Sequence, residues 1–222
     1  MTARIGIGAF SVLAEHWGRP PASHLDLIAV AQRADRLGFH SLGLPYVPLL
    51  SADATTSARF GGVGSFAHPY HLDAHALVPV LLHETARIKV GFQVLLAPVL
   101  HPFIWAKYLA SLEVMSGGRV LAGFGIGVAR PAGVPGAKVA GLDKLGLATR
   151  TRGRAADEAL EVMTRLWTSE EPFTFEGEHV IARDVAIEPR GLRPGGPELW
   201  WAGQSPRGYV RAARFADVLE LE

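Results

Sequence analysis

The stretch PELWWAGQSP (197–206) carries an apolar strand through a glycine into the start of a helix. Ser205 suits the N-cap of that helix and Pro206 its first helical position. The first amide groups of a helix have no internal partner and carry partial positive charge. Gly203 lets a ligand approach the backbone closely. The corner Gly203-Gln204-Ser205 is therefore suited to holding a phosphate group, although a plain strand-to-helix turn can have the same sequence.

Strand-like and helix-like segments alternate along the rest of the chain, which is typical of a parallel α/β sheet or barrel. We expect core strands at residues 4–10, 41–44, 88–96, 119–127, 197–202 and 217–221. We expect helices at residues 23–37, 74–87, 102–116, 152–167 and 206–215. Residues 173–188 are predicted to form a hairpin outside the sheet, because charged residues interrupt their apolar pattern.

The predicted helix at 152–167 has an inner and an outer face. Its outer face carries Arg154 with Glu158 and Glu161 with Arg165, each pair four residues apart. Such pairs are typical of a solvated helix surface. The residues expected to face inward are Ala156, Leu160, Met163 and Trp167.

Length and composition indicate a single domain over residues 1–222, since the chain has 222 residues and 49% hydrophobic content. The formal net charge of +1 and the lack of a long Lys/Arg run argue against a nucleic-acid partner. The chain has no cysteine, no signal-peptide pattern at its start and no apolar run that approaches about 20 residues. We therefore expect a cytoplasmic protein with no membrane partner.

Six motifs follow one another in a fixed order along most of the chain. They are ADRLGFHSLGLP (34–45), RIKVGFQVLLAPVLHP (87–102), AKYLASLEVMSGGRVLAGFGIG (106–127), RGRAADEALEVMTRLWT (152–168), FTFEGEHV (173–180) and IEPRGLRPGGPELWWAGQSPRGYVRAARFAD (187–217). In this order the chain resembles the luciferase-like monooxygenase family of flavin- and deazaflavin-dependent oxidoreductases.

The resemblance implies an α/β fold of the TIM type, a (β/α)8 barrel with the cofactor ring at its C-terminal mouth. Relatives run on for about two further βα units, so we expect a barrel truncated after about six strands. An open barrel edge leaves unpaired strand groups and apolar surface that need covering. We therefore expect a homodimer or a fragment of a longer chain.

The resemblance also assigns cofactor-binding residues at the C-terminal ends of the strands. They are Gly203, Gln204 and Ser205 at the phosphate corner, Gln93 and Val94 on the third strand, Gly127 and Val128 after the fourth, and Arg130 as a nearby phosphate partner. A non-proline cis peptide is expected around residues 92–94. The amide of Gln93 needs a partner if buried, and either the cofactor ring or a backbone carbonyl would supply one.

The catalytic residues are less well marked, because many relatives have a polar Asp-His-type pair where this chain has Pro45-Tyr46. No residue is a convincing general base. The candidates are Tyr46, His71 and His101. For His101, which precedes Pro102, a structural role at a helix start outweighs direct catalysis.

Histidines gather in one predicted loop, with His68, His71 and His75 close to Asp73. His71 and His75 are four residues apart and could share a helix face, as metal ligands do. No zincin motif accompanies them, so we expect no metal site. The loop is expected either to line the entrance of the pocket or to be plainly solvated.

The function that the resemblance implies is an oxidoreductase of the monooxygenase type. It would act on a small organic substrate with oxygen and reduced FMN, or with coenzyme F420, and a reductase would supply the reduced cofactor. One alternative is a non-catalytic or inactive flavin-binding protein with a reduced barrel. A second is a metal-dependent barrel hydrolase built on the histidine loop.

Overall fold

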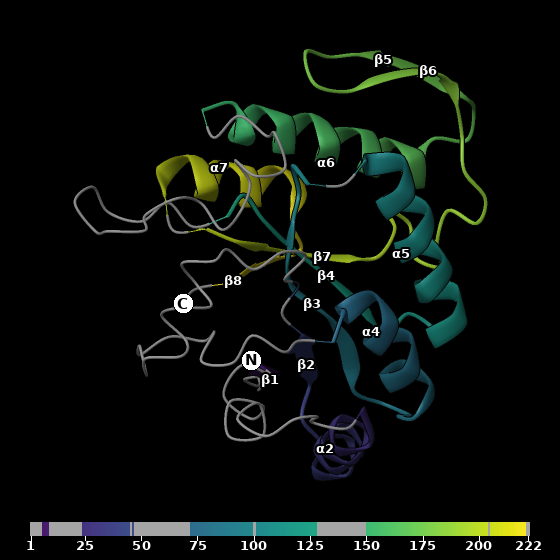
Figure 1. Cartoon of the computed structure of the whole chain (residues 1–222). Helices are drawn as coiled ribbons and strands as arrows, with labels where there is room; N and C mark the ends of the chain where they lie inside the picture. The colour runs from purple at the N-terminus through teal and green to yellow at the C-terminus, as the bar shows by residue number, and fades with distance from the viewer. Residues whose placement is uncertain are drawn as a thin grey trace. The chain divides into compact units, whose positions relative to one another are not determined.

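A computed structural model describes residues 6–8, 24–44, 46, 72–99, 101–127, 150–203 and 205–220 (Figure 1). The described residues fall into two compact units, and the boundary between them lies within one strand, between Gln93 and Val94. Five residues of the predicted site and histidine loop lie outside the described residues: His68, His71, Val128, Arg130 and Gln204.

The first unit consists of parallel strands and the helices that connect them. Its elements are β1 (Gly6–Gly8), α2 (His24–Leu37), β2 (Ser41–Leu44), α4 (Ala74–His83) and the first part of β3 (Lys89–Leu96). The strand order is β1-β2-β3, with Gly6 opposite Ser41 and Ser41 opposite Lys89. Its core includes Ala31, Leu42, Leu44, Val78, Leu81, Val90 and Phe92.

Helix α4 ends four residues earlier than predicted, at His83 instead of Arg87. The reason is a carboxylate on another helix. The backbone N–H groups of Ala86, Arg87 and Ile88 donate to the Asp35 side chain on α2 over 3.0, 3.0 and 2.7 Å. Asp35 thus fixes the connection from α4 to β3 in a non-helical path.

The second unit holds the remaining parallel strands and a small antiparallel hairpin. Its elements are the end of β3, α5 (Pro102–Ser116), β4 (Val120–Gly125), α6 (Arg152–Thr168), β5 (Phe173–Glu176), β6 (Ile181–Val185), β7 (Glu198–Ala202), α7 (Pro206–Phe215) and β8 (Val218–Glu220). The strand order is β3-β4-β7-β8, and β4, β7 and β8 run parallel. The hairpin β5–β6 lies beyond α6, as predicted (Figure 1).

The outer face of α6 binds neighbouring segments, so the prediction of an ordinary solvated surface is wrong. The Glu158 carboxylate accepts the backbone N–H groups of residues 178–180 over 3.1, 2.7 and 3.0 Å. Burial raises the pKa of Glu158, but these donors outweigh it and hold the pKa below its ordinary value. The Arg165 guanidinium lies 4.0 Å from the centroid of the Phe173 ring. Charges on α6 therefore hold the hairpin in place.

The elements otherwise occur where the sequence pattern predicts them. The inward residues of α6, from Ala156 to Trp167, are buried, and Gly117 ends α5 in the left-handed conformation at a φ of 66°. None of the helices in the described part of the chain has the length and apolar character needed to cross a bilayer. The single domain over residues 1–222 stays a prediction.

Candidate functional site

The corner between β7 and α7 forms as the sequence predicts. Ser205 is the N-cap, and its hydroxyl oxygen accepts the backbone N–H of Gly208 over 3.0 Å. Pro206 occupies the first turn. A side-chain carbon on Gly208 would lie 2.9 Å from the carbonyl oxygen of Gly203. Glycine at position 208 therefore lets the first turn of α7 lie directly against the residue that follows β7.

Gly203 lies against the indole ring of Trp201. A side-chain carbon at position 203 would come within 2.9 Å of Trp201 Nε1, so only glycine fits against the ring here. Trp201 is 1% exposed, and its N–H group has no hydrogen-bond acceptor among the described residues. A buried donor normally has a partner, and an anionic oxygen beside Gly203 is the kind of acceptor that would fit.

Trp201 is held in place by a buried arginine on α7. The Arg211 guanidinium lies 4.9 Å from the centroid of the Trp201 ring and is 7% exposed. It donates to Asp157 Oδ2 over 3.0 Å and to the Gly153 carbonyl over 3.1 Å, and its Nε also donates to Asp157. This network connects the ring to the first turns of α6.

The C-terminal ends of β3, β4 and β7 meet in the second unit with close backbone contacts. A side-chain carbon on Gly125 would lie 3.1 Å from Val94 Cγ2 and 3.5 Å from the carbonyl oxygen of Ala202. Gly127 follows with a φ of 80°, a conformation that favours glycine. The structure thus brings three predicted cofactor residues, Val94, Gly127 and Gly203, to the same edge of the sheet.

Gln93 belongs to the first unit and packs across β2. A side-chain carbon on Gly43 would overlap the Gln93 side chain, so glycine at position 43 makes room for the amide. Gln93 is half-buried. The peptide bonds at residues 92–94 are not cis, contrary to the resemblance; in the described ranges the cis bond is Glu188–Pro189.

A second polar cluster of the first unit consists of Tyr46, Asp73 and His75. Asp73 is the N-cap of α4, and its Oδ1 accepts from the backbone N of His75 over 2.7 Å. The same oxygen lies 2.9 Å from His75 Nδ1. Because a carboxylate oxygen can only accept, Nδ1 carries the proton and Nε2 the lone pair of the neutral ring.

Tyr46 lies edge-on to His75, with 5.0 Å between ring centroids and 87° between ring planes. Burial raises the pKa of the Tyr46 hydroxyl, and the nearby Asp73 carboxylate raises it further, so the hydroxyl stays protonated as a donor. The four-residue spacing of His71 and His75 indicated a possible metal pair and did not reveal this arrangement. The signal for it was present, since Asp-x-His at a helix start places both groups on one turn.

His101 has a structural role at the start of α5. It is the N-cap, and its Nδ1 accepts the backbone N–H of Phe103 over 3.4 Å. Pro102 follows in the first turn of α5, the position that the sequence predicts for it. Among the described residues no group of three or more His, Cys, Asp or Glu side chains could hold a metal ion.

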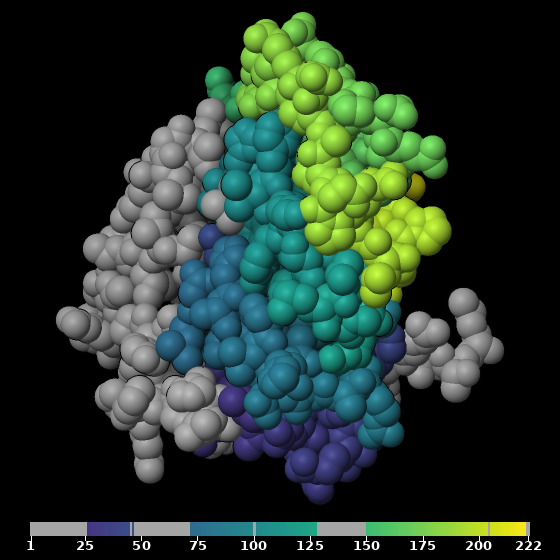
Figure 2. All heavy atoms as spheres, turned by 90° about the vertical axis from the view of Figure 1, so that its right-hand side faces the viewer, coloured from purple at the N-terminus to yellow at the C-terminus, as the bar shows by residue number. Residues whose placement is uncertain are grey.

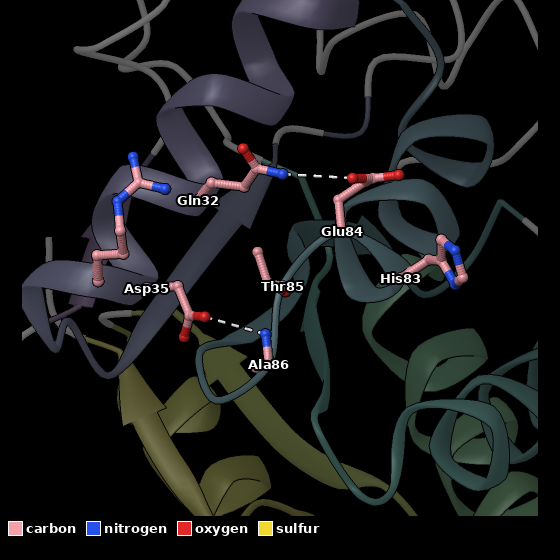
Figure 3. A pocket seen from close by; sticks show the side chains of 7 residues that line it. Gln32, Asp35, His83, Glu84, Thr85 and Ala86 are labelled. Carbon is pink, nitrogen blue, oxygen red and sulfur yellow. Dashed lines mark hydrogen bonds between the residues drawn. The ribbon is translucent and has the colours of Figure 1, made fainter.

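An open cavity of about 380 Å³ lies in the first unit (Figure 3). Its lining consists of Gln32, Asp35, Arg36, His83, Glu84, Thr85 and Ala86. Several of its polar groups already have partners. Gln32 donates to Glu84 over 3.3 Å and the Thr85 hydroxyl donates to the Leu81 carbonyl over 2.6 Å.

The Asp35 carboxylate at this cavity is saturated with donors. Burial raises its pKa, but the backbone N–H groups of residues 86–88 and the charge of Arg87 outweigh burial and lower the pKa below its ordinary value. The Arg87 side chain also donates to the Asp35 carbonyl over 2.9 Å. The polar groups here hold α2, α4 and β3 together.

Parallel strands joined by helices, with glycines at the strand ends, define the class of α/β proteins that bind ligands at the C-terminal edge of the sheet. The family model described as "luciferase-like monooxygenase" matches residues 5–221 of the chain. The chain belongs to this family, and its fold is the luciferase-like α/β fold.

Three similar proteins illustrate the range of the family. An F420-dependent glucose-6-phosphate dehydrogenase from Kineococcus radiotolerans is 29% identical over 196 residues, which are 79% of this chain and 56% of that protein. An FMNH2-dependent dimethylsulfone monooxygenase from Pseudomonas putida is 28% identical over 141 residues, 62% of this chain and 36% of that protein. The crystal structure of monooxygenase RslO1 from Streptomyces bottropensis has a TM-score of 0.74 at 22% identity, over 97% of this chain and 59% of that one.

The chain spans about half the length of the curated relatives it matches. These relatives include both F420-dependent and FMNH2-dependent enzymes. The relatives therefore differ in cofactor, and membership of the family does not choose between the two.

Proposed function

We propose that this chain binds reduced FMN or coenzyme F420 and acts as an oxidoreductase, of the monooxygenase type in the FMN case, on a small organic substrate. The observation that carries the proposal is the corner at Gly203. Gly203 there adjoins a capped helix N-terminus and a buried indole N–H that has no acceptor among the described residues. A phosphate group of either cofactor would supply the acceptor.

The residues that would hold the cofactor follow the edge of the sheet. Gly203, Gln204 and Ser205 would bind the phosphate, with Arg130 as a further partner. Val94, Gly127 and Val128 would contact the ring side of the site, and Gln93 would meet its edge. When bound, reduced flavin would supply the electrons that activate molecular oxygen, and a deazaflavin would exchange two electrons and a proton with the substrate.

His75 and Tyr46 are the residues we propose for proton handling. Asp73 fixes the orientation of the His75 ring through Nδ1. Tyr46, whose raised pKa keeps it neutral, would donate its hydroxyl hydrogen. Replacing His75 by Gln should lower turnover and leave cofactor affinity unchanged, because the group acts on protons and does not hold the phosphate.

The test of the binding site is a comparison of two double variants in cofactor titrations. Gly203→Val with Ser205→Ala should weaken binding of FMN or F420 more than removal of His71 and His75 does. Val at position 203 would collide with the Trp201 ring, and Ala at 205 removes the cap. Equal affinities in the two double variants would contradict the phosphate corner. Binding without turnover would instead favour the non-catalytic flavin-binding protein.

We also propose that the chain forms a homodimer through the exposed face of α5. Ile104 and Met115 are 65% and 79% exposed, and with Tyr108 and Ser111 they follow a spacing that places all four on one face of the helix. This helix lies at the surface in Figure 2. The four side chains carry no charge, so the face can pack against its own copy across a two-fold axis.

The solution mass decides this assignment. Ile104→Glu with Met115→Glu should convert a dimer to a monomer, measured by light scattering during gel filtration. Val210, which is 70% exposed on α7, offers a matched control, and Val210→Glu should leave the dimer intact. A wild-type chain with the mass of a monomer, or a double variant that stays dimeric, would contradict the α5 interface.

A further inference from the structure

The indole N–H of Trp201 is the one group in the corner that the family resemblance did not assign. The ring is 1% exposed, yet Nε1 has no acceptor within the described part of the chain. Leaving such a donor without a partner costs about 1–3 kcal/mol, so a folded protein seldom does so without reason. Nε1 lies against the backbone of Gly203, at the corner that leads to the N-terminus of α7, so a ligand held at this corner is the nearest candidate for its partner.

The neighbouring tryptophan on β7 provides the contrast. Trp200 Nε1 donates to Glu198 Oε1 over 2.8 Å, so its hydrogen-bonding need is met within the chain. Successive residues of a strand face opposite sides of the sheet, which places the two rings in different surroundings. Only the ring of Trp201 adjoins Gly203.

The surroundings of Trp201 hold its ring in one orientation. The Arg211 guanidinium lies 4.9 Å from the centroid of the ring, with its charge paired to Asp157. Its pairing with Asp157 and Gly153 fixes the guanidinium, and the stacking fixes the orientation of the ring. At the other side of the corner, the Ser205 hydroxyl accepts from Gly208 and keeps its own hydrogen for donation.

We propose that Trp201 donates its indole N–H to the phosphate group bound at the Gly203 corner. The inference rests on the proposed function, since it requires a phosphorylated cofactor at this corner. Trp201 would then be a binding residue that contacts the phosphate from the side of β7, while the N-terminus of α7 and Ser205 bind it from the helix side. Arg211 would be a positioning residue that acts through the ring.

The experiment follows the indole N–H signals of the five tryptophans by two-dimensional NMR of the ¹⁵N-labelled full chain. The Trp201 signal is assigned through the backbone and checked by its disappearance in Trp201→Phe. We expect it to shift on addition of inorganic phosphate and of FMN or F420, whichever binds, while the Trp200 signal does not respond to inorganic phosphate. Riboflavin, which lacks the phosphate, should not produce the shift.

Affinity supplies the second measurement. Trp201→Phe keeps an aromatic ring, smaller than the indole, next to Arg211 but removes the N–H, so it should weaken binding of the cofactor about tenfold. Trp200→Phe is the matched control and should change affinity by less than about twofold, since its N–H is used within the chain.

The outcomes separate this inference from the proposed function. If the amide signals of Gly203 and Gly208 shift with phosphate while the Trp201 indole signal does not, the role of Trp201 is wrong and the phosphate corner stands. If FMN and F420 both fail to bind the wild-type chain, the proposed function itself fails. If Trp201→Phe does not fold, the shift of the wild-type indole signal still decides the question.

Discussion

Two regions of the molecule contain buried polar groups next to a helix end, and they differ in how those groups are satisfied. In the first unit, the Asp35 carboxylate accepts three backbone N–H groups over 2.7–3.0 Å. In the second, the Trp201 N–H lies against Gly203 with no acceptor among the described residues. The first region has used its hydrogen-bonding capacity in folding, and the second has kept part of it.

This difference is a better guide to function than cavity volume. The cavity of about 380 Å³ adjoins Asp35, where the carboxylate is saturated by the chain itself. The corner at Gly203 is small, but it combines an unused donor with a helix N-terminus. Saturated buried groups hold a fold together, whereas unsaturated ones need a partner from outside. Variants in the two regions should therefore affect different properties.

The largest effect is expected for Asp35→Ala, on stability. The change leaves the N–H groups of residues 86–88 without their acceptor, at a cost of about 3 kcal/mol or more of unfolding free energy. Asp35→Asn keeps one acceptor oxygen and should cost less. Urea unfolding measures both, and cofactor affinity of the folded protein should not change. An Asp35→Ala variant as stable as the wild type would contradict the claim that the hydrogen bonds of Asp35 stabilise the first unit.

Gly203→Ala should weaken cofactor binding, which Asp35→Ala should not. The added methyl group would lie 2.9 Å from Nε1 of the buried Trp201 ring, so the ring or the backbone of the corner must shift, at some cost in stability and with loss of the phosphate-binding geometry. We expect FMN to bind about tenfold more weakly or worse, equivalent to about 1.4 kcal/mol. Riboflavin affinity serves as the control and should be unchanged, because riboflavin has no phosphate. A similar loss of affinity for FMN and riboflavin would mean that the corner does not bind the phosphate.

The pH dependence of stability should also follow the saturated groups. The pKa of Asp35 is held below its ordinary value of 3.8, so the unfolded chain binds the proton more readily than the folded one. Its contribution is therefore present above the ordinary pKa and is lost as the pH falls through the lowered one. Asp35→Asn should lose part of this acid sensitivity in urea unfolding between neutral pH and the acid range. Glu158, whose pKa is also lowered, should account for another part.

The carboxylate of Glu113 on α5 has the opposite effect on the pH dependence of stability, because its pKa is raised. It is 1% exposed, and burial raises its pKa although Arg193 lies 3.6 Å away. A raised pKa means that the folded state binds the proton more tightly, so this stabilising contribution is lost as the pH rises through the raised value. The acid sensitivity expected of the wild type is therefore a sum of opposing contributions, and only variants separate them.

What could be predicted from sequence were the features that depend on neighbouring residues. The strand–glycine–helix corner, its Ser205 cap and the helix over 206–215 needed only local apolar pattern and capping rules. The Asp35 cluster joins residues more than fifty positions apart, and Glu158 reaches the turn of the hairpin about twenty positions on. No local sequence pattern predicts such contacts. The predicted α4 was therefore too long, and the outer face of α6 was predicted to be solvated where it binds the hairpin. The orphaned N–H of Trp201 depends on which way one ring turns, which only the folded chain decides.

The smallest effect is expected at the exposed end of the cavity in the first unit. Glu84 is exposed, and its hydrogen bond with Gln32 spans 3.3 Å between two side chains that water can also satisfy. Glu84→Ala should change the unfolding free energy by less than about 0.5 kcal/mol and leave FMN affinity unchanged. The two variants Asp35→Ala and Glu84→Ala line the same cavity, so together they separate its volume from its hydrogen bonds. If Glu84→Ala weakened FMN binding as strongly as Gly203→Ala, the cavity and not the corner would hold the cofactor, and the unsatisfied indole of Trp201 would need another explanation.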